Sequence, residues 1–158
     1  MEDVYNGNKP NMKLQLVSFE QALALKELGY SQDDSKFCYP VITVRMQNTY
    51  EGYPYSFSPG DIINLLEESA NGSYFIGIVS DDDLINAPSL EEVAKWLRDE
   101  KNLWIEISKG GYEKSAHCFL GDYIYEDATH IKEFNSYEEA LSAGIDKAIK
   151  ILKKNDND

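Results

Sequence analysis

The sequence contains little cysteine, little histidine and few basic residues, and it has no long apolar run. Its 158 residues include two cysteines and two histidines, which is too few for a disulfide framework and few for a zinc site. No apolar stretch approaches the roughly 18 residues that a membrane-spanning helix needs. Only 15 residues are basic against 28 that are acidic, and the formal charge of −13 disfavours binding to nucleic acids or anionic membranes, because both depend on Lys and Arg.

Catalytic and metal-binding motifs are also missing. None of the patterns GxSxG, GxGxxG, Walker A or HExxH occurs, which excludes the common enzyme classes that they mark. His117 is adjacent to Cys118, but neighbouring residues of a regular strand point to opposite faces and form no Cys–His dyad. The acidic residues 81–83 lack EF-hand spacing, because Ile85 stands where the fifth-position ligand should be. We therefore predict no enzymatic activity, no catalytic residue, no metal site and no cofactor.

What the chain does contain is enough apolar material for one folded domain. Apolar residues make up 42% of the sequence and aromatic residues 12%, so a core can form. Residues 1–11 and 153–158 are polar and lack periodicity, which predicts two flexible tails around a single domain of residues 12–152. The N-terminal residues show no secretory signal, so the cytoplasm is the default location. We expect Cys38 and Cys118 to be free buried thiols, the alternative being a bridge between them.

Four helix starts are recognisable from capping residues. Ser18, Ser89 and Ser136 are each followed three residues later by Gln or Glu, which is the pattern of a capping box. A fourth start is expected at Ser58, because Pro59 suits the first helical position. The predicted helices cover residues 18–29, 58–70, 89–101 and 136–153. The last of these carries one apolar stripe at helical spacing, formed by Leu141, Ile145, Ala148, Ile149 and Leu152.

Strand-like runs lie between the helices, at residues 37–46, 74–79, 103–108 and 112–125. Gly110-Gly111 separates the last two and suits a two-residue type I′ turn, since both positions need positive φ. That turn places Trp104 opposite His117 and Leu103 opposite Cys118. The fold class predicted is α+β, with one small antiparallel sheet that includes a 103–125 hairpin and with about four helices packed mainly on one face.

Two aromatic sets are candidate patches for a partner or a ligand. The predicted register places Trp104, His117 and Phe119 on the face opposite the aliphatic residues. Tyr53, Tyr55 and Phe57 alternate around Pro54 in an extended segment. Exposed rings of this kind stack on sugars, bases or prolines. The alternative for the first set is burial under helix 58–70 or the 31–57 segment, and for the second an edge strand or loop folded over the core.

Several segments carry a resemblance to known proteins. They are the opening helix of residues 19–29 followed by Tyr30, the run Ala-Pro-Ser-Leu to Leu-Arg at residues 87–98, the strand Leu-Trp-Ile-Glu-Ile at 103–107, and Ser-Tyr-Glu-Glu-Ala-Leu at 136–141. Together they resemble a group of small uncharacterised proteins of gut Bacteroidetes, their prophages and mobile elements. The group has no assigned activity, so the resemblance implies a biological context and a fold but no site residue.

The expected function follows from these points. We predict a non-enzymatic accessory or adaptor protein of phage or mobile-element type that acts through contacts with an unknown protein partner, and not through nucleic acid or a membrane. One alternative is an acidic nucleic-acid mimic that inhibits a DNA-binding protein, because the charge of −13 shapes the whole surface. A third is a binder of a glycan or nucleotide through an aromatic face.

Overall fold

The structure of the chain is a computed structural model, which describes residues 15–33, 36–50, 52–109, 116–122 and 129–156. Its fold class is α+β, as predicted. The helices of the described residues are α2 (Phe19–Glu27), α3 (Leu65–Ala70), α4 (Leu90–Lys101) and α5 (Tyr137–Asn155). None of these helices is long and apolar enough to cross a membrane.

The described strands form three antiparallel sheets of three strands each, where the sequence had predicted one sheet. The first has the order β4-β1-β6, the second β3-β2-β5 and the third β7-β8-β9. Their bounds are β1 (Phe37–Pro40), β2 (Val44–Asn48), β3 (Pro54–Phe57), β4 (Ile63–Asn64), β5 (Ser73–Phe75), β6 (Leu84–Asn86), β7 (Leu103–Lys109), β8 (Ala116–Asp122) and β9 (Thr129–Phe134). Strands β4, β6 and β9 were not predicted, and β4 and β6 are too short to show alternation in the sequence. Strand β3 is the edge strand that was one of the alternatives for residues 53–57.

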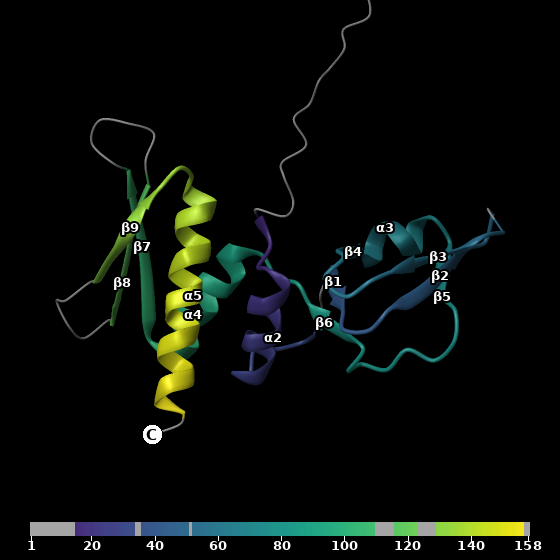
Figure 1. Cartoon of the computed structure of the whole chain (residues 1–158), viewed down its shortest axis with the longest axis horizontal. Coiled ribbons are helices and arrows are strands. Elements are labelled where there is room, and N and C mark those ends of the chain that lie inside the picture. Colours follow the sequence, from purple (N-terminus) through teal and green to yellow (C-terminus); the bar gives the residue numbers. More distant parts are fainter. Residues whose placement is uncertain (1–14, 34–35, 51, 110–115, 123–128, 157–158) are drawn as a thin grey trace, which may run out of the picture.

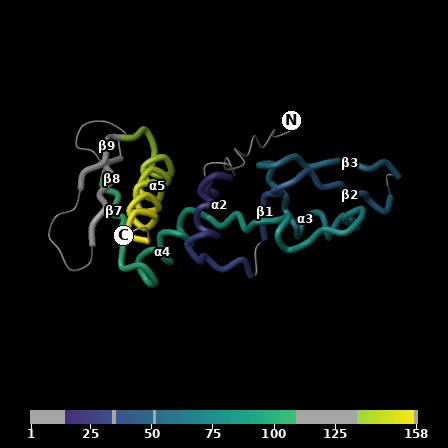
Figure 2. The backbone as a smooth tube through the Cα atoms, turned by 60° about the horizontal axis from the view of Figure 1, so that its bottom comes forward, coloured from purple at the N-terminus to yellow at the C-terminus, as the bar shows by residue number. Residues whose placement is uncertain are grey.

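The elements form two lobes that lie side by side in Figure 1. The helical lobe holds α2, α4, α5 and the sheet β7-β8-β9, and its helices α4 and α5 lie on one face of that sheet (Figure 1). The sheet lobe holds α3 and the strands β1 to β6. Figure 2 shows the same separation from a second direction, with α2 and β1 between the ends of the molecule.

The helix caps follow the predicted chemistry in full at Ser18 and Ser89 and in part at Ser136. Ser18 and Ser89 both form complete capping boxes, at the starts of α2 and α4. The box predicted at Ser136 is incomplete: Ser136 Oγ accepts a hydrogen bond from the Glu139 N–H at the start of α5, but the Glu139 carboxylate accepts from the Asn135 N–H instead of the Ser136 N–H. These side chains satisfy N–H groups that would otherwise lack partners in the first helical turn.

The larger core fills the space between α2, α4 and α5. Leu25, Leu97 and Ile145 are among its fully buried side chains, and the predicted stripe of α5 faces this core. One buried polar side chain joins two helices there, because Gln21 Nε2 on α2 donates to Asp146 Oδ1 on α5 at 2.8 Å. Packing against α5 therefore secures α2, whose own amphipathic pattern is weak.

A smaller core lies inside the sheet lobe. Its buried members are Cys38, Val44, Met46 and Ile63, and Phe75 is among the side chains that pack against them. Cys38 is a free thiol, as predicted, and burial raises its pKa to about 11. The Cys118 side chain lies outside the described residues.

The predicted helix 58–70 is wrong over its first half. Ser58 donates its N–H to Asp61 Oδ2 at 2.6 Å, and the Asp61 N–H donates back to the Ser58 carbonyl oxygen. Gly60 follows the turn with φ of +85°, which no helix contains. The side chain of Asp61 therefore closes a local turn instead of capping a helix, and α3 begins only after Asn64.

The predicted two-residue turn at Gly110-Gly111 is also wrong. The last pair of the β7-β8 ladder is Lys109 with Ala116, so six residues connect the strands, and they lie outside the described part of the chain. Trp104 is paired with Gly121 and His117 with Ser108. Because the pairing shifts by four residues, an even number, the predicted division of the strands into two faces is unchanged.

The tails differ from prediction at one end. Helix α5 continues to Asn155, and Lys153 Nζ lies 2.7 Å from Glu27 Oε2, so residues 153–155 belong to the folded domain. Residues 1–11, predicted as the other tail, lie outside the described residues.

Two of the predicted strands have different bounds in the structure. The predicted strand 37–46 is divided between β1 and β2, and β5 ends at Phe75, four residues earlier than the predicted strand.

Candidate functional site

Tyr55 and Phe57 of β3 lie on the inner face of the sheet β3-β2-β5. Both rings are partly buried against the smaller core and meet edge to face with 5.8 Å between their centroids. The Tyr55 hydroxyl donates to Glu68 on α3 and lies 2.7 Å from Ser73 Oγ. The Tyr55 hydroxyl therefore ties the edge strand to α3, and Phe57 packs beside it.

Tyr53, unlike Tyr55 and Phe57, is almost fully exposed to solvent. Its side chain is 84% exposed, and Tyr50, in the same turn between β2 and β3, is 87% exposed. The strand register places Gln47 between Pro54 on one side and Tyr74 on the other, and Tyr74 is 52% exposed. We call these five residues the distal surface, because they lie at the end of the sheet lobe that is remote from α2, α4 and α5 (Figure 1).

The outer face of this sheet is left open by the alternation of its strands. Val44 and Met46 of β2 are buried, whereas Arg45 between them is exposed. Neighbouring positions on the flanking strands, Ser56 and Tyr74, are exposed as well. One face of the sheet therefore covers the smaller core, and the other is available for contact with another molecule.

Trp104 lies on β7 in the other lobe and is 38% exposed. The Arg98 guanidinium lies 5.2 Å from the centroid of its ring, which is a cation–π contact. The sheet lobe, which was expected to cover this ring if it was buried, is at the far end of the molecule (Figure 1). The register separates Trp104 from His117, and the side chains of His117 and Phe119 lie outside the described residues.

We predict that Trp104→Ala lowers the free energy of unfolding by about 1–2 kcal/mol, which is the sum of partial burial and one exposed cation–π contact. Urea denaturation followed by circular dichroism measures the change. Trp104→Phe is the matched control and should recover about half of the loss, because it keeps an aromatic ring against Arg98. A loss above about 3 kcal/mol would show that the ring is a core residue.

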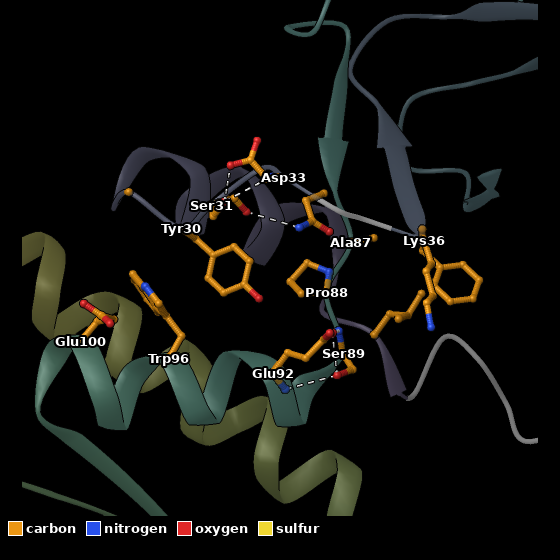
Figure 3. A pocket seen from close by; sticks show the side chains of 14 residues that line it. Tyr30, Ser31, Asp33, Lys36, Ala87, Pro88, Ser89, Glu92, Trp96 and Glu100 are labelled. Carbon is orange, nitrogen blue, oxygen red and sulfur yellow. Dashed lines mark hydrogen bonds between the residues drawn. The ribbon is translucent and has the colours of Figure 1, made fainter. Parts of the chain in front are cut away.

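A separate cavity lies where the two lobes meet (Figure 3). Its volume is about 610 Å³, which falls within the range of small-molecule sites. The walls come from the end of α2, the segment leading into β1, the segment between β6 and α4, and one side of α4. We call it the junction cavity, and the side chains that matter most for its chemistry are Tyr30, Asp33, Lys36, Glu92, Trp96 and Glu100.

Two aromatic rings form one wall of the junction cavity. Tyr30 and Trp96 meet edge to face with 5.3 Å between their centroids, and the Tyr30 side chain extends into the cavity (Figure 3). The Tyr30 N–H donates to the Leu25 carbonyl oxygen at 2.9 Å, which fixes this residue at the end of α2. Lys101 Nζ lies 5.1 Å from the centroid of the Trp96 ring, so the indole already attracts one cation of the chain.

The charges around the junction cavity are mainly negative. Asp33, Glu92 and Glu100 line it, and among the lining residues that the structure describes Lys36 is the one basic residue. The Glu92 carboxylate accepts from the Ser89 N–H at 2.8 Å as part of the α4 cap. Burial, and next the charge of Glu92, raise the pKa of the Tyr30 hydroxyl, so Tyr30 remains a neutral donor.

The sequence carries a signal for this cavity in the spacing of three residues of α4. Glu92, Trp96 and Glu100 are spaced by four residues, which places them on one side of α4. Tyr30 and Asp33 come from the segment after α2, and only tertiary packing, seen in the contact of Tyr30 with Trp96, brings them to the same place. Of the predicted patch residues whose side chains the structure describes, Tyr53, Tyr55, Phe57 and Trp104, none lines the junction cavity.

Comparisons of the chain with protein-family models, with curated proteins and with solved structures find no match. Among the described residues, no group of three or more His, Cys, Asp or Glu side chains is placed to hold a metal ion. Function is therefore inferred from the distal surface and the junction cavity themselves.

Proposed function

We propose that this protein is a non-enzymatic cytoplasmic adaptor that binds a partner protein through its distal surface, in the phage or mobile-element context that the resemblance of its sequence implies. The single observation that carries the proposal is the exposure of Tyr50, Tyr53 and Tyr74 around one end of an open sheet face. Tyrosine is enriched in protein interfaces, because its ring buries apolar area and its hydroxyl remains hydrogen-bonded.

The charge of the molecule indicates what kind of partner fits. The described residues of the sheet lobe from 36 to 86 include six acidic side chains, Asp61, Glu67, Glu68, Asp81, Asp82 and Asp83, against two basic ones, Lys36 and Arg45. A second copy of the chain would bring −13 against −13, which opposes self-association. The partner we infer is therefore a protein with a basic surface around an apolar contact.

The proposal is tested with a double variant, Tyr53→Ser with Tyr74→Ser, and with Tyr137→Ser as the matched control. Tyr137 is 47% exposed and lies at the start of α5 in the other lobe. Partners are captured from a lysate of the source cell, identified and purified, and their affinities are measured by calorimetry. We expect the double variant to bind at least tenfold more weakly and the control to bind normally, as for an interface with aromatic hot spots.

Other outcomes would overturn the proposal. Binding that the double variant retains, and that moderate salt abolishes, would indicate recognition of the acidic surface alone, as in a nucleic-acid mimic. A thermal shift with a glycan or nucleotide that the double variant loses would indicate a ligand-binding face. Equal weakening by the control variant would show that the two tyrosines have no special role.

A further inference from the structure

We propose that the junction cavity is a second, separate binding site, and that it binds a guanidinium or alkylammonium cation. This site goes beyond the adaptor function, because none of the distal-surface residues lines it. The cavity is formed by both lobes, so a ligand there would contact segments on both sides of their junction (Figure 3).

The aromatic wall supports a cationic ligand. Trp96 is the ring type that attracts cations most strongly, and it already has Lys101 at 5.1 Å from its centroid. Tyr30 meets Trp96 edge to face, so the two rings present differently oriented surfaces to the same space. The stem of an arginine, lysine or polyamine is apolar and packs against such rings while its charged end remains polar.

The carboxylates supply the counter-charge at the ends of the same wall. Glu92 and Glu100 lie one turn of α4 before and after Trp96, and Asp33 approaches from the segment that precedes β1. Among the described residues, the three carboxylates outnumber the nearby ammonium groups, which are Lys36 in the lining and Lys101 against the Trp96 ring. The cavity is therefore negative, which disfavours an anion such as a nucleotide phosphate. A carboxylate on either side of an aromatic ring suits a long cation with a charged group at its end.

Glu100 is the best residue for a test. Glu92 closes the cap of α4 through Ser89, so its removal would also weaken the helix. Glu100 lies in the last turn of α4 and is exposed, and its carboxylate is unfavourable beside the negative end of the helix dipole. Glu100→Gln should therefore leave the fold intact while it removes one charge from the cavity.

Two probes distinguish the sources of the cation. Agmatine represents a free small guanidine, and the blocked peptide Gly-Gly-Arg-Gly-Gly represents an arginine of a partner protein. The blocked peptide with citrulline in place of arginine is the uncharged control. Binding is followed by calorimetry and by the fluorescence of Trp96 in a Trp104→Phe background, which leaves one indole in the chain.

We expect binding that saturates in the millimolar range or below, that weakens with salt and that is absent with the citrulline peptide. Glu100→Gln should weaken it at least threefold. Lys36→Gln should strengthen it at least twofold, because it removes the competing cation from the cavity. Glu91→Gln, which removes a charge from the same helix outside the cavity, should leave the affinity unchanged.

Several results would overturn the site. Citrulline peptide that binds as tightly as the arginine peptide would show that charge is not recognised. Equal weakening by Glu100→Gln and Glu91→Gln would show a bulk electrostatic effect, and weaker binding by Lys36→Gln would contradict the predicted polarity of the cavity. If neither agmatine nor the arginine peptide saturates the protein at concentrations up to about 10 mM, the proposed cation site is also rejected. The double variant of the distal surface should bind both probes normally, so failure of one proposal does not decide the other.

Discussion

Replacing Ile145 by Asp is expected to unfold the protein. Ile145 is fully buried in α5, within the core shared with α2 and α4. An unpaired carboxylate in that position costs several kcal/mol. This cost is comparable with the free energy of unfolding of a typical domain, which is roughly 5–15 kcal/mol. Circular dichroism and thermal melting of Ile145→Asp should show no cooperative transition at 25 °C or above.

Lys147→Asp is the matched control, because it introduces the same carboxylate on the exposed side of the same helix. We expect it to change the free energy of unfolding by no more than about 0.5–1 kcal/mol. A cooperative melt of Ile145→Asp at the wild-type temperature would show that α5 does not dock through this face.

The second large effect is expected at Tyr39, which joins the sheet lobe to α2. Its buried ring meets Phe19 edge to face at 5.8 Å, and its hydroxyl donates to the Val17 carbonyl oxygen at 2.6 Å. Tyr39→Phe leaves a buried carbonyl oxygen without this donor and should cost about 1–3 kcal/mol. Tyr39→Ala also removes the ring and should cost about 3–5 kcal/mol.

The measurement is urea denaturation of both variants, with Tyr53→Ala as the control for loss of an exposed tyrosine. That control should cost no more than about 0.5 kcal/mol. If Tyr39→Phe were as stable as the wild type, the hydrogen bond to Val17 would contribute nothing net. If Tyr39→Ala produced two separate transitions, the lobes would unfold independently once this contact was lost.

The contacts of Tyr39 also explain why the junction cavity has a defined shape. The Val17 N–H donates to the Pro88 carbonyl oxygen at 3.0 Å, and Leu16 forms an isolated antiparallel bridge with Ser89. These bonds hold the segment before α4 against the segment before α2. The positions of Tyr30 and Trp96 in the cavity wall are therefore fixed by the same packing that joins the lobes. A ligand would bind to a cavity that is already formed.

Helix starts were predictable where a single capping residue determines them. Ser18 and Ser89 cap their helices in the predicted way, since capping depends only on residues three positions apart. Ser58 failed as a helix start because another local interaction, the hydrogen bonds between Ser58 and Asp61, competes for the same groups. A sequence pattern does not indicate which of two such local bonds forms, because both use the same residue types.

The candidate sites depended more strongly on tertiary structure. Alternation within 53–57 predicts that Tyr53, Tyr55 and Phe57 share one face, but β3 begins only at Pro54, so Tyr53 lies outside the regular strand. The smaller core decides that Tyr55 and Phe57 face inward, while Tyr53 remains 84% exposed. The junction cavity depended on tertiary structure even more, because its acidic and aromatic residues come from α4 and from the segment that follows α2.

The sequence by itself determined the α+β class, the capped ends of three helices, the buried stripe of α5 and the two faces of β7, because each depends on residues only a few positions apart. Tertiary structure alone decided the division into three sheets, the β7-β8 pairing and the meeting of Tyr30 with Trp96. Such pairings join residues distant along the chain, and their free energy comes from shared burial, which periodicity within one segment does not specify.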